Sequence, residues 1–197
     1  MSGVASPTTE TKDQIVVAAT ELFRRQGFNG TSMSQVAEVS GATTGSIYHF
    51  FPSGKAQLTE EVLRKSGESY RQLVEAIVTS ATDPAIAMSD AFAGAAAVLA
   101  STDYIDPCPI GTIAREVANT HPELREVANS IISSWVETVS TIFEEAGIAS
   151  DRASSLARLA VASIEGGFIM ARSSREVDAF IGIGEALRDA VQAELDR

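Results

Sequence analysis

Apolar side chains recur at helical spacing along most of this chain, and no segment shows a convincing strand alternation. Between residues 15 and 23 the apolar positions form one stripe with a period of three to four residues, as in an amphipathic helix. Turn-forming and capping residues separate further stretches of this kind, so the pattern predicts an all-α protein with about nine helices. They are expected at about residues 11–26, 32–40, 43–51, 53–80, 84–100, 107–117, 121–146, 150–172 and 174–195.

The most informative pattern lies within residues 31–55. Ser32 and Gln35 have the spacing of a capping box, which predicts the start of a short helix. Gly41 can turn the chain with positive φ, and Ile47 then fills the angle between this helix and the next. Two crossed helices joined by a glycine turn make a helix-turn-helix, the motif we expect here.

The second helix of this motif is expected to begin at about Thr43 or Thr44 and to end at Phe51. The N-terminal end of such a helix enters the major groove of DNA, where hydroxyl and imidazole groups suit base edges and phosphates. For the hydroxyls of Thr31 and Ser32, which precede the first helix of the motif, capping of that helix is the alternative role. The residues expected to contact DNA are Thr31, Ser32, Thr43, Thr44, Gly45, Ser46, Tyr48, His49 and Lys55.

Residues 15–58 resemble the DNA-binding domain of the TetR family of transcriptional regulators. The resemblance implies a helix-turn-helix domain over residues 11–58 and a helical ligand-binding and dimerisation domain over residues 59–197. The segment from Asp106 to Val117 is similar to the LmrA/YxaF-like branch of that family. Gly54, which is one residue more than the family pattern has before Lys55, also fits that branch. The matching residues are Ile15, Ala18, Ala19, Leu22, Phe23, Gly27, Thr31, Ser32, Val36, Ala37, Gly41, Gly45, Ile47, Tyr48, Phe51, Lys55 and Leu58.

Charge qualifies the expectation of DNA binding. The formal net charge is −11, which opposes binding to phosphates. Residues 1–58, however, contain four basic and four acidic residues, so the whole excess of acidic residues lies in residues 59–197. We therefore expect a modest, salt-sensitive affinity that requires two helix-turn-helix domains acting together.

Other features of the composition indicate a cytoplasmic protein. The single cysteine, Cys108, excludes an intramolecular disulfide, and residues 1–10 lack the apolar core of a signal peptide. The longest apolar run, residues 91–100, is too short to span a bilayer, so no membrane partner is expected. Two roles stay open for Cys108: a redox sensor or a small buried hydrophobe.

Bulky apolar residues in the second domain suit a pocket for a small hydrophobic or aromatic effector, and the family resemblance implies such a pocket. Ordinary core packing is the alternative for each of them. Glu165 interrupts an apolar helix, where it can receive a polar group of the ligand, pair with an arginine or face solvent. The residues expected to bind the effector are Phe92, Ile110, Trp135, Phe168 and Glu165.

The last two helices are expected to form the interface of a homodimer, because small residues crowd one and apolar residues line the other. Packing within the chain is the alternative. With two histidines and without a catalytic triad, a metal-ligand spacing or a phosphate loop, the sequence predicts neither an enzyme nor a cofactor. We expect a repressor that leaves a palindromic operator on double-stranded DNA when its effector binds. An activator or a protein-interaction adaptor with the same fold are the alternatives.

Overall fold

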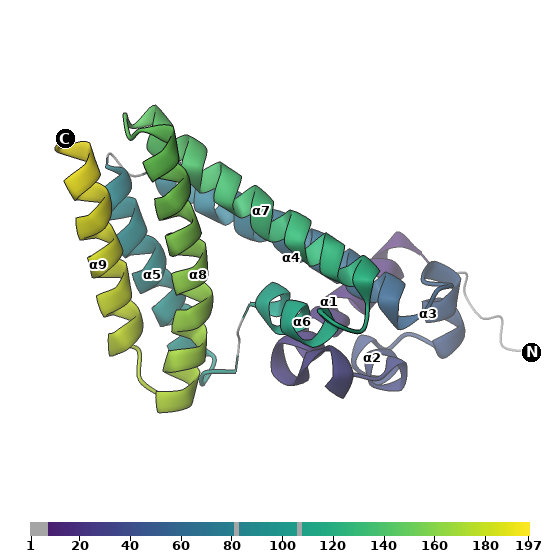
Figure 1. Ribbon diagram of the computed structural model, residues 1–197. Coiled ribbons are helices and arrows are strands. Elements are labelled where there is room, and N and C mark those ends of the chain that lie inside the picture. The colour runs from purple at the N-terminus through teal and green to yellow at the C-terminus, as the bar shows by residue number, and fades with distance from the viewer. Residues whose placement is uncertain (1–7, 81–82, 106–107) are drawn as a thin grey trace, which may run out of the picture. The chain divides into compact units, whose positions relative to one another are not determined.

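The computed structural model describes residues 8–80, 83–105 and 108–197, with only the backbone of residues 78–80. Within these ranges all regular secondary structure is helical, which confirms the prediction of an all-α fold (Figure 1). The helices of the described ranges are α1 (Thr9–Gly30), α2 (Met33–Ser40), α3 (Thr44–Phe50), α4 (Lys55–Ser80), α5 (Pro84–Ser101), α6 (Pro109–Val117), α7 (Pro122–Glu145), α8 (Ser150–Ser174) and α9 (Asp178–Leu195).

Several helix boundaries follow the predicted capping residues. At the start of α2 the Ser32 hydroxyl accepts a hydrogen bond from the Gln35 amide at 3.2 Å, and the Ser32 amide donates to Gln35 Oε1 at 2.8 Å. This reciprocal pair is the predicted capping box. Gly41 ends α2 with φ 67°, as expected for the turn. The Asp83 carboxylate accepts from the Ala85 amide at 2.7 Å and caps α5.

Other boundaries differ from the prediction. α1 begins two residues earlier than expected, because Thr8 caps it in a reciprocal pair with Thr11. α8 begins at Ser150 as predicted, but it ends two residues later than expected, at Ser174, and its N-cap Ala149 makes no side-chain cap hydrogen bond. The predicted start of α6 at residues 106–107 lies outside the described ranges.

The chain forms two compact units. The first comprises residues 1–66 with 109–128, and the second residues 67–108 with 129–197. The predicted domain boundary at residue 58 falls inside α4, and α6 belongs to the first unit together with the helix-turn-helix. α4 and α7 each contribute residues to both units.

In the first unit, α1 is the helix on which the others assemble. It contacts α2, α3 and α6 (Figure 1). Its apolar stripe is buried, as its helical spacing predicts, and each neighbouring helix adds apolar side chains to the same core. The largest buried side chains of this core are Ile15, Phe23, Ile47, Phe51, Leu58, Leu63, Ile110 and Ile113.

In the second unit, α5 packs extensively against α9, and α8 packs against α9 beside them (Figure 1). Two glycines allow this close approach. A Cβ at Gly184 would lie 2.5 Å from Phe92 Cβ, and a Cβ at Gly167 would lie 2.6 Å from the Phe180 ring. The core of this unit is therefore built from phenylalanine rings packed directly onto glycine backbone.

α5 is the most apolar helix of the described chain. By length and composition alone its 18 residues could cross a membrane. In this structure Phe92 and Leu99 of α5 are buried in the core shared with α8 and α9. An apolar helix at the centre of such a core passes the same length and composition test.

Candidate nucleic-acid interface

The N-terminal end of α3 is fixed by a local hydrogen-bond network. The Thr43 hydroxyl accepts from the Ser46 amide at 3.1 Å, which makes Thr43 the N-cap. The hydroxyl oxygens of Thr43 and Ser46 also lie within hydrogen-bond distance, at 2.9 Å. Two side chains that were expected to contact DNA thus first define where the helix begins.

The outward side of α3 is polar and accessible. Ile47 and Phe51 are 0% and 1% exposed and hold the helix on the core, while Thr44, Gly45 and His49 are exposed. Tyr48 is 47% exposed. This arrangement presents hydroxyl groups at the N-terminal end of α3, the end that a helix-turn-helix inserts into the major groove, and places the phenol and imidazole groups further along the same helix.

Gly54 lies close to the Tyr48 ring. It has φ 72°, a backbone conformation that favours glycine, and a Cβ there would lie 3.7 Å from Tyr48 Cε1. The additional residue between α3 and α4 therefore sits against the exposed tyrosine, on the surface that the sequence assigns to DNA.

The Lys55 side chain packs against the protein and does not extend freely into solvent, as a phosphate-binding lysine would. Its Nζ lies over the Phe28 ring, 4.2 Å from the centroid, in a cation–π contact. Partial burial lowers the pKa of the Lys55 ammonium, and the negative charge of Glu116 acts in the opposite direction. A phosphate contact by Lys55 stays a prediction, and it requires the ammonium to compete with this local contact.

Thr31 is buried, whereas its neighbour Ser32 is exposed. Thr31 is 3% exposed, and its hydroxyl donates to the Gly27 carbonyl at 2.8 Å. Ser32 is exposed and caps α2. The Gln26 amide group donates to the Thr31 hydroxyl at 3.3 Å and to the Gly30 carbonyl at 2.9 Å, a supporting role that the sequence pattern did not suggest.

The predicted effector residues do not form one set in the structure. Phe92 and Phe168 meet through Phe180, with ring centroids 5.3 Å and 5.2 Å from it. Trp135 is buried elsewhere in the second unit, where its Nε1 donates to the Gly67 carbonyl at 3.0 Å. Ile110 is fully buried in α6 of the first unit. Glu165 is half-buried on α8.

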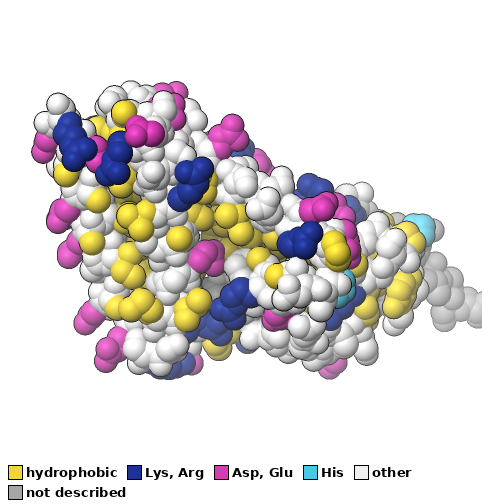
Figure 2. Space-filling model, viewed as in Figure 1, with side chains coloured by type: hydrophobic (Ala, Val, Ile, Leu, Met, Phe, Trp, Pro, Cys, Tyr) yellow, Lys and Arg dark blue, Asp and Glu magenta, His cyan; other side chains and the backbone are white. Residues whose placement is uncertain are grey.

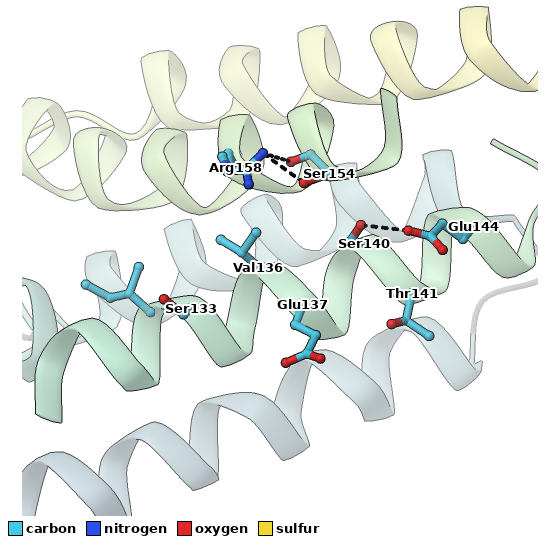
Figure 3. A pocket seen from close by; sticks show the side chains of 9 residues that line it. Ser133, Val136, Glu137, Ser140, Thr141, Glu144, Ser154 and Arg158 are labelled. Carbon is cyan, nitrogen blue, oxygen red and sulfur yellow. Dashed lines mark hydrogen bonds between the residues drawn. The ribbon is translucent and has the colours of Figure 1, made fainter. Parts of the chain in front are cut away.

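A groove of about 650 Å³ lies between α7 and α8 in the second unit (Figure 3). Its lining is mostly polar, and it includes none of the predicted effector residues. Arg158 is held at its rim by a 2.8 Å hydrogen bond to the Ser154 hydroxyl, and Ser140 donates to Glu144 at 3.2 Å. The lining residues are Ile132, Ser133, Val136, Glu137, Ser140, Thr141, Glu144, Ser154 and Arg158.

The helices expected at a dimer interface expose some apolar residues and bury others. Phe180, Leu187 and Val191 are among the apolar residues that line α9, and they are buried in the core of the chain itself. For these residues the alternative of intramolecular packing is correct, because α9 turns them towards α5. Figure 2 shows hydrophobic side chains spread over the accessible face of α8 and α9. The large ones among the exposed residues are Leu159, Ile169, Met170 and Ile181.

Comparisons with known proteins agree with this architecture. Residues 15–62 match the family described as bacterial regulatory proteins, tetR family. Residues 84–186 match the family described as transcriptional regulator LmrA/YxaF-like, C-terminal domain. The crystal structure of regulatory protein TetR from Rhodobacter sphaeroides superposes with a TM-score of 0.83 at 15% identity, covering 92% of this chain and 99% of that one, which shows the shared fold.

Sequence relatives extend over nearly the whole chain. The HTH-type transcriptional regulator YxaF of Bacillus subtilis is 29% identical over 178 residues, which cover 90% of this chain and 93% of that protein. The HTH-type transcriptional regulator Rv0196 of Mycobacterium tuberculosis is 32% identical over 190 residues, covering 93% and 95% of the two chains. The protein therefore belongs to the TetR family of DNA-binding transcriptional regulators, in its LmrA/YxaF-like branch.

Proposed function

We propose that the protein is a cytoplasmic repressor that binds a palindromic operator as a homodimer and leaves it when a small hydrophobic or aromatic effector binds the second unit. The observation that carries the proposal is the exposed polar side of α3, which is opposite its buried anchors Ile47 and Phe51. Two such helices, one from each protomer, fit successive major grooves about 34 Å apart on a symmetric site. The residues proposed to contact DNA are those expected from the sequence, with Thr31 acting through the turn that it stabilises.

The proposed dimer interface is the exposed stripe of α8, with Ile181 of α9 beside it. Leu159, Ala162, Gly166 and Met170 recur on one side of α8 at intervals of three or four residues, and large apolar side chains on a surface stripe favour a partner helix. Met170→Glu should give a monomer in light-scattering measurements. Val17→Glu, at a residue 67% exposed on α1, is the matched control and should leave the dimer intact.

The proposed effector site draws on the aromatic residues of the second unit. Three rings come together there from α5, α8 and α9, those of Phe92, Phe168 and Phe180. Trp135 of α7 contacts α4 through its hydrogen bond to the Gly67 carbonyl. Aromatic groups of this kind suit an apolar ligand. Trp135→Ala should weaken effector binding while leaving operator affinity in the absence of effector unchanged. Unchanged effector binding would remove Trp135 from the site.

Binding to the DNA immediately upstream of the protein's own gene, measured at about 50 and 200 mM salt, tests the central claim. A repressor should bind this DNA in the presence of excess unrelated DNA, lose affinity with salt, and lower transcription from the adjacent promoter in vitro. Raised transcription would indicate the alternative of an activator. Absence of specific binding to any duplex would favour an interaction adaptor.

A further inference from the structure

α1 is broken just before the helix-turn-helix. Gly27 has φ 75° and ψ −180°, which is not helical, and the helical turn of residues 28–30 follows it. A break of this kind leaves the next backbone amides without their usual carbonyl partners four residues earlier. One of these amides, that of Asn29, donates to Glu116 Oε2 at 2.6 Å.

Glu116 reaches this turn from α6, which contacts α1 in the first unit (Figure 1). The carboxylate occupies the space beside Gly27, since a Cβ there would lie only 1.9 Å from Glu116 Oε1. Glycine at position 27 thus meets two requirements, the positive φ and the room for the carboxylate. A carboxylate bonded to a backbone amide makes a charge-assisted hydrogen bond, among the stronger kinds in proteins.

The same carboxylate acts on the start of α4. Lys55 lies over the Phe28 ring, within the electrostatic influence of Glu116. The Phe28 ring also makes an edge contact with the His121 ring, at a centroid distance of 4.9 Å. The turn itself is closed by the hydrogen bond from the Thr31 hydroxyl to the Gly27 carbonyl. One acidic side chain therefore influences both chain segments that flank α2 and α3.

We infer that Glu116 is a positioning residue for DNA binding. By capping the Asn29 amide it fixes the turn of residues 27–31, and this turn sets the direction in which the chain enters α2. The inference rests on the family function of DNA binding through α2 and α3. It gives a structural role to an acidic residue next to a surface that approaches phosphates, where its charge alone opposes binding.

Two substitutions separate the cap from the charge. Glu116→Ala removes both, whereas Glu116→Gln keeps an oxygen that can accept from the Asn29 amide. Glu126→Ala, which removes an exposed acidic residue from α7 in the same unit, is the matched control for charge. The probe is a DNA duplex selected from a random-sequence library by the wild-type protein, and amide hydrogen exchange at Asn29 is measured without DNA.

Glu116→Ala should speed exchange at Asn29 and weaken binding to the selected duplex, each by about tenfold or more, because the charge-assisted hydrogen bond that caps the Asn29 amide is lost. Glu116→Gln should keep both within about threefold of the wild-type values, and Glu126→Ala should not weaken binding. Equal losses in the Ala and Gln variants, or binding by Glu116→Ala as tight as by Glu126→Ala, would overturn the inference. If the Ala variant does not fold, Glu116→Asp takes its place: it keeps the charge but is one methylene shorter, so it should show the same two losses, and wild-type exchange and binding in this variant would overturn the inference. A wild-type protein that selects no duplex would instead refute the DNA-binding function, and the inference with it.

Discussion

Each of the two units of this protein is stabilised by a different kind of interaction. In the first unit the short helices α2 and α3 are defined by hydrogen bonds from hydroxyl caps at Ser32 and Thr43, and few apolar side chains anchor them. In the second unit α5 and α9 pack over their length, with phenylalanine rings against glycine backbone. The short helices of the helix-turn-helix are thus fixed by local hydrogen bonds, whereas the second unit is a tightly packed core. Substitutions should therefore separate DNA affinity from global stability.

The largest effect is expected at Tyr48. Because Tyr48 is 47% exposed, Tyr48→Ala should change the unfolding temperature little. Loss of one DNA contact costs about 1–3 kcal/mol, and a dimer loses two, so operator binding should become undetectable in a mobility-shift assay at moderate salt. Light scattering should still show a dimer. Unchanged operator affinity would show that the DNA-contacting surface lies elsewhere on the first unit.

Gly184→Ala tests the packed core. The new methyl group would lie 2.5 Å from Phe92 Cβ, so chemical denaturation should show a loss of about 1–3 kcal/mol of unfolding free energy. Gly94→Ala in α5 is the control. No atom outside the neighbouring backbone lies within 4 Å of its added Cβ, so this variant should gain up to about 1 kcal/mol from helix propensity. Equal effects at the two positions would contradict the role given to glycine packing.

Thr43→Ala tests the local caps. It removes the hydroxyl that accepts from the Ser46 amide, so it should cost about 1 kcal/mol and fray the start of α3. Ser150→Ala should cost less than about 0.5 kcal/mol, because the Ser150 hydroxyl does not cap α8. Thermal unfolding measures both variants, and a larger loss at Ser150 would show that this comparison of caps is wrong.

The smallest effect is expected at an exposed ion pair. Hydrogen bonds from Arg71 and Gln72 lower the pKa of the Glu68 carboxyl to about 2, from 4.5. A carboxyl with a lowered pKa in the folded state stabilises the fold above pH 4.5, and this contribution disappears as the pH falls towards 2. Thermal unfolding of wild type and Glu68→Gln should therefore differ slightly at pH 7 and converge as the pH approaches 2. A difference that grows on acidification would contradict this pKa shift.

The sequence predicted the helix-turn-helix well because the determinants of this motif are local, whereas the membership of α6 in the same unit required the structure. Ser32 with Gln35, Gly41 and Ile47 all act within a few residues of their partners, and each lies in the structure where its spacing indicates. The same patterns failed where a contact joins distant segments. The bond between Asn29 and Glu116 spans 87 residues of sequence, and no periodicity connects the two ends.

The second unit shows the same limit. Phe180, Leu187 and Val191 form an apolar stripe on α9, which a periodicity argument assigns equally to a dimer interface or to the core. The packing of α9 on α5 decides in favour of the core, and that pairing joins two helices whose first residues, Pro84 and Asp178, are 94 positions apart in the sequence. The aromatic residues expected around an effector were likewise identified by type, but their distribution among different clusters required the structure.

The position of Trp135 has a practical consequence. It is the single tryptophan of the chain, it is 8% exposed, and its indole N–H donates to the Gly67 carbonyl at the contact between α7 and α4. Indole fluorescence moves to longer wavelength when water reaches the ring. Any molecule that separates these two helices at this contact should therefore shift the emission of the unlabelled protein towards the red. The protein thus contains an intrinsic optical probe with which a library of small molecules can be screened before any operator is known.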